Sequence, residues 1–479
     1  MRDSSNWETL PERFAMLAED ARAEGADVEL VAESKRESLF ASHQGQIDRC
    51  EQSEVARCGI RAIVDGREGY SWTEAWDESG LRQACQLAIQ QARAIAREQR
   101  HDGGWRDCEG IELLSSSAAG GEDRSRTASC DSILSTASCG TRELNIQEMA
   151  SRAIELETSV LAMDSRIRKV PHNRYRDLRR SWGVWNSKGV AREFHDHAVQ
   201  LYAYALAEEA GQARMAGETA FWRQIEGRSD RYSTEAPRVA RAAAEKAVAK
   251  LGAVTPPTGV YRVLIRGEAM AGLLSRAAQY FSAQAVHERT SIFSGSLACQ
   301  IACDEVSIYD EPLDLDAPGY RPFDAEGATS QPTRVVRAGR LESFLTNLTY
   351  ARRLGVPHTR HAARSPDGVL EIAPSNLVWR AGNSEDSQLL KGQGEVLVIT
   401  DLAGFHSGFR QGSGEFSLQA EGELWSGGEK QKSLCNFVVS GSIRELFCRV
   451  VGTGQRLSPA VGLARAPDVL VSDLSIAGA

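Results

Sequence analysis

Two pairs of histidines in this sequence have spacings from which metal sites are built. His195 and His197 are two residues apart, which places both side chains on one face of a β-strand. His358 and His361 are three residues apart, in a segment that follows Pro357. A zinc site takes three or four protein ligands, and no third ligand stands near either pair at a recognisable spacing. We therefore predict surface histidines, or histidines satisfied by hydrogen bonds.

A further histidine starts a sequence that looks like a zinc motif. His287 is followed by Glu288, as in H-E-x-x-H, but the second ligand would have to stand where Ser291 or Ile292 is found. A helix must return that ligand about one turn later for both to reach one ion. The sequence therefore predicts no metal at this pair.

Two longer blocks of sequence carry a more specific pattern. The first is the helical stretch 273–280 followed by Thr290–Gly295, which reads TSIFSG, and the second is the stretch 413–422, which contains S-G-x-F-S and then A-x-G. Together they resemble the TldD/PmbA family of peptidase subunits, and the resemblance extends over residues 1–100 and 143–479. The catalytic member of that family carries H-E-x-x-x-H on a helix just ahead of a T-S-x-F-S-G-like turn.

The resemblance implies that the zinc site of the catalytic member is degenerate in this chain. Ser275, Arg276 and Tyr280 stand where His, Glu and His would fall if one gap is allowed. None of the three is a usual zinc ligand or general base. The catalytic member also uses a late cysteine as a third ligand, but Cys448 has no histidines to complete here. We therefore expect no catalytic, cofactor-binding or metal-binding residue in this chain.

What the resemblance implies about function is a PmbA (TldE)-like, non-catalytic subunit of a heteromeric metallopeptidase. Zinc is then expected in a TldD-like partner, and the substrates are unfolded peptides or modified-peptide precursors. The turn F-D-x-E-G occurs in catalytic and non-catalytic members alike. Asp324 and Glu326 in that turn are therefore predicted to cap or form the turn rather than to act as an acid/base pair.

Two other functions stay open at this point. One is a homodimeric peptide-binding or scaffold protein that has no peptidase partner. The other is an enzyme with an unrecognised site, for which His195, His197 and Cys448 are the candidate residues.

Composition excludes several classes of partner. The chain has 479 residues and a net charge of -9, and its pI of about 5.7 argues against nucleic-acid binding. The sequence has no apolar run of the roughly 18 residues that a membrane span needs, and its first residues are not those of a signal peptide, so we expect a cytoplasmic protein. Its ten cysteines show no C-x-x-C spacing and are expected to be reduced thiols, with Cys299 and Cys303 in the core.

The arrangement of elements predicts an α+β fold with two domains. Residues 1–254 are expected to form an N-terminal helix and sheet domain with several short strands, a hairpin at Asp65-Gly66, and helices over 8–24, 81–100, 146–163 and 236–251. Within it, the segment 101–141 is rich in Ser, Gly and Ala and reads as a mobile insertion. The TPPTG segment at 255–259 marks the boundary.

Residues 255–479 are predicted to form a mostly antiparallel β domain, as in TldD/PmbA-like proteins. A helix is expected over 268–282, and strands at 303–309, 333–336, 396–400, 416–421 and 434–439. The segment PHTRHAARSP at 357–366 departs from the family pattern, since relatives usually have a Thr-Gly pair there.

Overall fold

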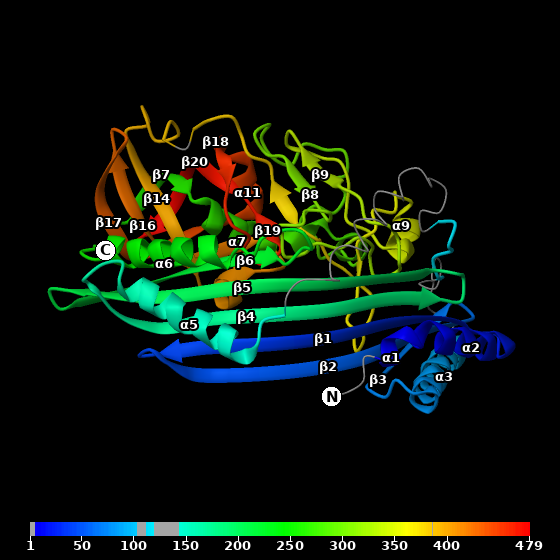
Figure 1. The fold of residues 1–479 in the computed structure, drawn as a ribbon. Coiled ribbons are helices and arrows are strands. Elements are labelled where there is room, and N and C mark those ends of the chain that lie inside the picture. The colour runs from blue at the N-terminus through cyan, green and yellow to red at the C-terminus, as the bar shows by residue number, and fades with distance from the viewer. Residues whose placement is uncertain (1–4, 103–111, 119–142, 386) are drawn as a thin grey trace.

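The computed structural model describes residues 5–102, 112–118, 143–385 and 387–479. It is a mixed α+β fold built mostly on antiparallel sheets, as predicted (Figure 1). Most of the expected insertion at 101–141 lies outside the described residues, although helix α3 runs on to Asp102. The boundary between 254 and 255 falls between α6 and β7, and we retain it as a proposal.

The first half of the chain forms a six-stranded antiparallel sheet in the order β3-β2-β1-β4-β5-β6. Its long strands run side by side across the lower part of Figure 1. The bounds are β1 Asp27–His43, β2 Gln46–Val64, β3 Arg67–Thr73, β4 Ile167–Asn186, β5 Ala191–Glu209 and β6 Gln212–Arg223.

The expectation of several short strands in this region was wrong, because β1 is a single strand of 17 residues. Its polar middle looked like an interruption of the apolar alternation. In the structure those side chains are held by cross-strand ion pairs, such as Arg176 to Glu37 at 2.7 Å and Arg180 to Glu33 at 2.6 Å. The strand therefore continues where the sequence alone predicted a break.

Tight turns join β2 to β3 and β5 to β6 in this sheet. The predicted hairpin at Asp65-Gly66 is confirmed, with φ of 50° and 70° at its two residues. Two successive positive φ values are those of a type I′ turn, which matches the twist of the flanking strands. Ala210-Gly211 joins β5 to β6 in the same way, with φ of 48° and 79°.

Helices cover the two ends of the sheet and leave its polar middle between them (Figure 1). Each of the four predicted helices is found, with ends within a few residues of those expected. At one end are α1 Ser5–Glu8, α2 Leu10–Ala23 and α3 Glu78–Asp102, and at the other α5 Ile146–Leu161 and α6 Tyr232–Ala249. Asn145 caps α5 in a reciprocal capping box with Glu148, which fixes where that helix begins.

The second half of the chain is built on a seven-stranded sheet in the order β14-β7-β20-β17-β16-β15, with β18 paired to β20. Because β16 also pairs with β14, the strands β14, β7, β20, β17 and β16 close into a ring. The bounds are β7 Gly259–Ile265, β14 Glu395–Ala403, β15 Phe409–Arg410, β16 Glu415–Ser426, β17 Glu429–Ser442, β18 Val450–Leu457 and β20 Pro467–Ala477.

Smaller elements complete this half, around a core that includes helix α7. They are helices α7 Gly267–Ala277, η1 Ala278–Phe281, α8 Ala283–His287, α9 Leu348–Leu354, α10 Phe405–Gly408 and α11 Ile443–Cys448, and strands β8 Ile308–Asp310, β9 Thr333–Arg337, β10 Arg340–Leu341, β11 Ala362–Ala363, β12 Glu371–Ile372, β13 Leu377–Trp379 and β19 Ala464–Arg465. The strand expected at 303–309 is reduced to β8, because Cys303 and Val306 form a turn.

Among the described residues, no helix combines the length and the apolar character that crossing a bilayer requires.

Candidate functional site

Helix α7 and the turn η1 that follows it contain the three positions at which the resemblance places the degenerate zinc motif. Its first turn is fixed by Asp468, which accepts a hydrogen bond from the Gly267 amide at 2.8 Å and pairs with Arg266 at 2.5 Å. The α-helix ends at Ala277, and the tighter turn η1 follows directly. Ser275 and Arg276 thus lie on the α-helix, whereas Tyr280 lies beyond its end.

Tyr280 is part of the core and is not free to bind a ligand. Its side chain is fully buried, and its hydroxyl donates to the Gln411 carbonyl at 2.7 Å. The ring lies edge-on to Phe293, with centroids 6.4 Å apart. The Ser291 hydroxyl donates to the Tyr280 carbonyl at 2.6 Å. Burial raises the pKa of Tyr280 to about 12, so the phenol remains protonated.

The other two positions of the motif are directed elsewhere. The exposed Arg276 guanidinium lies over the Phe405 ring, 5.6 Å from its centroid, and Ser275 faces Gly462. A guanidinium stays protonated in proteins and cannot donate a lone pair to a metal. This set of donors does not fit a zinc ion.

Replacing Tyr280 with Phe gives a direct measure of that structural role. We expect Tyr280→Phe to lower the free energy of unfolding by about 1 kcal/mol, because the hydroxyl loses its hydrogen bond to the Gln411 carbonyl and a longer one of 3.5 Å to the Arg410 carbonyl, while the ring packing is kept. Urea denaturation of both proteins measures the difference. An unchanged stability would contradict the structural role of the hydroxyl.

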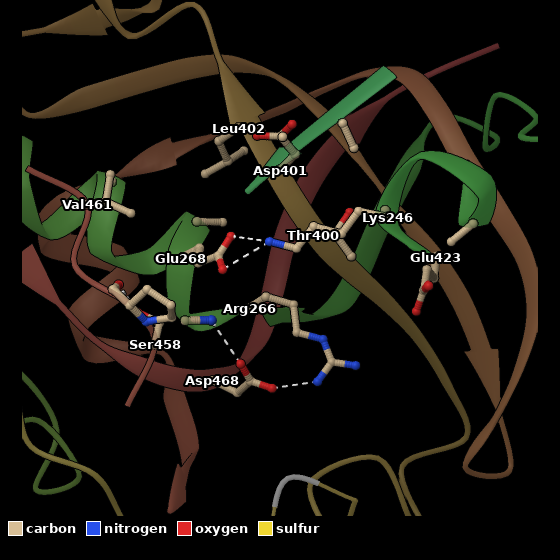
Figure 2. A pocket seen from close by; sticks show the side chains of 18 of the residues that line it. Lys246, Arg266, Glu268, Thr400, Asp401, Leu402, Glu423, Ser458, Val461 and Asp468 are labelled. Carbon is tan, nitrogen blue, oxygen red and sulfur yellow. Dashed lines mark hydrogen bonds and ion pairs between the residues drawn. The ribbon is translucent and has the colours of Figure 1, made fainter. Parts of the chain in front are cut away.

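A cavity of about 670 Å³ opens beside the first turns of α7 (Figure 2). Its walls come from both halves of the chain: the end of α6, the start of α7, strands β14 and β16, and the segment 456–461. Lys246 bridges Glu218 and Glu268, each at 2.8 Å, across this boundary. Leu402, Phe405 and Val461 supply apolar surface, so the cavity offers both charged and apolar contacts to a ligand.

The two histidines on β5 do not form a shared site. His195 Nδ1 is 2.8 Å from the Ser181 hydroxyl, and His197 Nε2 is 2.8 Å from Asp177 Oδ2. Each ring is satisfied by its own neighbour on β4, as predicted. His361 is likewise satisfied, buried between Asp310 at 3.0 Å and the Thr359 hydroxyl at 2.9 Å. Burial lowers the pKa of His361, which favours the neutral ring.

His287 and Glu288 lie at the end of the short helix α8, where each side chain contacts a neighbouring residue. The His287 ring lies edge-on to Tyr350, with centroids 5.7 Å apart, and Glu288 accepts a hydrogen bond from Gln284 at 2.9 Å. Ser291, at one position where H-E-x-x-H needs its second ligand, is buried and bonded to the Tyr280 carbonyl.

The cysteine expectations are only partly met. Cys303 is half-buried with its thiol 3.2 Å from the Val450 carbonyl, but Cys299 is exposed, so its placement in the core was wrong. Cys299 lies in a turn in which its amide donates to the Ser296 carbonyl, and the turn leaves its side chain exposed. Cys448 is also exposed, at the end of α11.

Asp324 and Glu326 have the structural role predicted for them. Asp324 Oδ1 accepts hydrogen bonds from the amides of Glu326 at 3.0 Å and Ala328 at 2.9 Å, which closes the turn. Glu326 Oε2 accepts the Leu348 amide at 2.9 Å, at the first turn of α9. Both side chains are fully buried.

The structure brings a third residue to this pair that the sequence did not connect with it. His358 Nε2 lies 3.6 Å from Glu326 Oε2 and 4.0 Å from Asp324 Oδ2. The three potential metal ligands lie within 4.8 Å of one another. His358 belongs to the segment 357–366 that departs from the family pattern. No local spacing signals the meeting, because two separate loops supply the three residues.

A buried network of charges links this turn to the N-terminal sheet. Arg61 on β2 donates to Glu68 at 2.8 Å, and its Nη1 lies 3.8 Å from Glu29 Oε1 and 3.9 Å from Glu326 Oε1. Glu29, Arg61 and Glu326 are fully buried. Burial raises the pKa of Glu29, whose cost of ionisation is offset in part by Arg61 and Arg364.

Comparison with known proteins agrees with this architecture. Three domain models match the chain in order: PmbA/TldA metallopeptidase domain 1 over residues 28–95, the central domain over 140–251 and the C-terminal domain over 258–478. The chain belongs to the PmbA/TldD family.

Relatives within the family are similar over nearly the whole length. The metalloprotease PmbA of Escherichia coli O157:H7 is 23% identical over 97% of this chain and 94% of its own. The PmbA homolog of Haemophilus influenzae is 23% identical over 91% of this chain and 89% of its own. A putative modulator of a DNA gyrase from Thermotoga maritima has a TM-score of 0.82 at 25% identity and covers 98% of this chain and 100% of its own. TldE from Thermococcus kodakarensis shares the fold, with a TM-score of 0.79 at 16% identity over 97% of this chain and 100% of its own.

Proposed function

We propose that this PmbA/TldD-family chain is a TldE-like, non-catalytic subunit of a heteromeric zinc metallopeptidase. The observation that carries the proposal is the donor set on and after α7: a hydroxyl, a guanidinium and a buried phenol bonded to the Gln411 carbonyl. The names of its relatives attribute metal-dependent proteolysis to them, so a metal site is expected in the assembly. In this proposal a TldD-like partner supplies the zinc.

The contribution of this chain is a wall of the peptide-binding cleft. The cavity beside α7 supports that role, because its size and its mixed lining suit a stretch of extended peptide. The short strand β15 is an edge of the seven-stranded sheet, where a peptide can add main-chain hydrogen bonds. The substrates that we propose are unfolded peptides or modified-peptide precursors, in the cytoplasm.

Reconstitution tests the proposal. We expect no peptide cleavage by this chain alone, and cleavage when it is mixed with a TldD-like chain that carries H-E-x-x-x-H. Size-exclusion chromatography should show one complex that contains both chains. Replacing the histidines of that motif in the partner should abolish the activity, whereas Cys448→Ser in this chain should leave it unchanged.

Three outcomes would overturn this assignment. Cleavage by the lone chain that disappears with His195→Ala would support an enzyme with its own site. A stable homodimer that binds peptide but ignores the TldD-like chain would support a scaffold protein. Full activity of the TldD-like chain without this one would remove the subunit role.

A further inference from the structure

The cluster of Asp324, Glu326 and His358 has distances that hydrogen bonding does not explain. An N–H···O bond spans about 2.7–3.2 Å, whereas His358 Nε2 is 3.6 Å and 4.0 Å from the two carboxylate oxygens. Two ligands that share one tetrahedral zinc ion at bonds of about 2.0–2.2 Å lie roughly 3.3–3.6 Å apart. The separation of 3.6 Å between His358 and Glu326 lies at the upper end of this range, and the separation of 4.0 Å between His358 and Asp324 requires a small movement of one side chain when an ion binds.

An unsatisfied buried atom gives a second, independent indication of a ligand. His358 Nε2 is buried and has no hydrogen-bond partner among the described residues. Glu326 Oε1 also lacks a hydrogen-bond partner among them, but it faces Arg61 at 3.9 Å and is not the oxygen nearest to His358. Buried polar atoms are nearly always satisfied by protein, water or an ion.

The two carboxylates are already fixed in position. Asp324 is held by two amides of its own turn and, through Oδ2, by the Ala362 amide at 3.2 Å. Glu326 Oε2 is held by the Leu348 amide. These bonds leave further lone pairs on the oxygens that face His358, and they lower the entropy cost of binding an ion.

Two buried arginines near the cluster offset part of its negative charge. Arg61 lies 3.9 Å from Glu326 Oε1 and donates to Glu68. Arg321 donates to the carbonyls of Ala362 at 3.4 Å and Ala373 at 3.2 Å, and its charge also acts on Asp324. His358 Nε2 has no hydrogen-bond partner among the described residues, so this nitrogen is available to an ion.

We propose that Asp324, Glu326 and His358 bind one zinc-class divalent cation. Two carboxylate oxygens and one imidazole nitrogen are a donor set that Zn²⁺ accepts, with a fourth position left for water. The His358 side chain is 19% exposed, which provides a path for the ion. The site differs from the degenerate motif on α7, and its ligands come from the turn 324–326 and from the segment 357–366.

Zinc titration of the purified chain against a chromophoric chelator tests the proposal. We expect one equivalent of Zn²⁺ bound by the wild-type chain, and an affinity weakened by roughly tenfold or more in His358→Ala and in Glu326→Gln. Glu326→Gln keeps an acceptor for the Leu348 amide, so the turn is retained. His406→Ala removes an exposed histidine and is the matched control, with wild-type binding expected. Zinc should also raise the thermal midpoint of the wild-type and His406→Ala chains only.

Equal zinc affinity and stoichiometry in the wild-type, His358→Ala and Glu326→Gln chains would overturn the proposal, and so would a wild-type chain that binds no zinc. Circular dichroism verifies that each variant is folded. This inference goes beyond the proposed function. Zinc binding is measured on this chain alone, whereas the proposed function is tested by peptide cleavage in a mixture of two chains. A failure of the zinc proposal therefore leaves the proposed function standing.

Discussion

Replacing Arg61 with Met is expected to destabilise the protein by about 3–5 kcal/mol, because two fully buried carboxylates would lose the cation between them. Glu29 and Glu326 are each within 4 Å of the Arg61 Nη1 atom, and both side chains are fully buried. Urea denaturation, followed by tryptophan fluorescence, measures the loss.

The same strand offers a matched control for this prediction. Arg49 is also on β2 and pairs with Glu51 at 2.6 Å, but about half of each side chain is exposed. We expect no measurable change for Arg49→Met, since water replaces an exposed partner. Glu29 keeps Arg364 at 3.4 Å in this variant, so Glu326 is the carboxylate left without an arginine, and adding Glu326→Gln to Arg61→Met should restore part of the stability. A cost for Arg61→Met no larger than for Arg49→Met would show that the buried network does not stabilise the fold.

Replacing Gly59 with Ala is expected to separate the segment 364–367 from strand β2. A Cβ atom at Gly59 would lie 1.9 Å from the Pro366 carbonyl oxygen, and the nearest atoms belong to the backbone. One of the two must move, which costs about 1–3 kcal/mol or more. The movement would also disturb the bonds of Arg364 to the Gly59 carbonyl and of Arg57 to Asp367.

Trypsin provides a local readout for this variant. Arg364 is buried in the native protein and should be cut slowly, whereas in Gly59→Ala the peptide bond after it should become accessible. Gly412→Ala is the control, because nothing lies within 4 Å of the added Cβ there. Cleavage after Arg364 at the same rate in wild type, Gly59→Ala and Gly412→Ala would show that this contact does not hold the segment in place.

Local signals explain which elements could be predicted. The hairpin at Asp65-Gly66 and helix α5 carry turn and capping residues that act within a few positions. The length of β1 could not be read in this way, because its polar middle is stabilised by arginines of β4, more than a hundred residues later in the chain. The exposure of Cys299 also depends on the loop in which it lies, not on its residue type.

The candidate site likewise includes features that depend on contacts between residues far apart in the sequence. The altered motif at Ser275, Arg276 and Tyr280 could be located because the family resemblance places its positions in one short stretch of sequence. The cluster at Asp324, Glu326 and His358 could not, because tertiary folding brings two loops together and each loop alone lacks a ligand set. Hydrogen bonds that fix Asp324 and Glu326 confirm the turn role, which the family resemblance favoured over an acid/base pair.

The central position of β20 has a consequence for synthesis of the protein. Strand β20, Pro467–Ala477, pairs with β7, β17 and β18, so the ring of strands has a gap until these residues exist. The N-terminal sheet needs nothing beyond Arg223 for its own pairing. During translation the N-terminal sheet can therefore assemble early, while the apolar interior around α7 waits for the last strand to leave the ribosome. A nascent chain stalled before Pro467 should expose that interior and depend on chaperones.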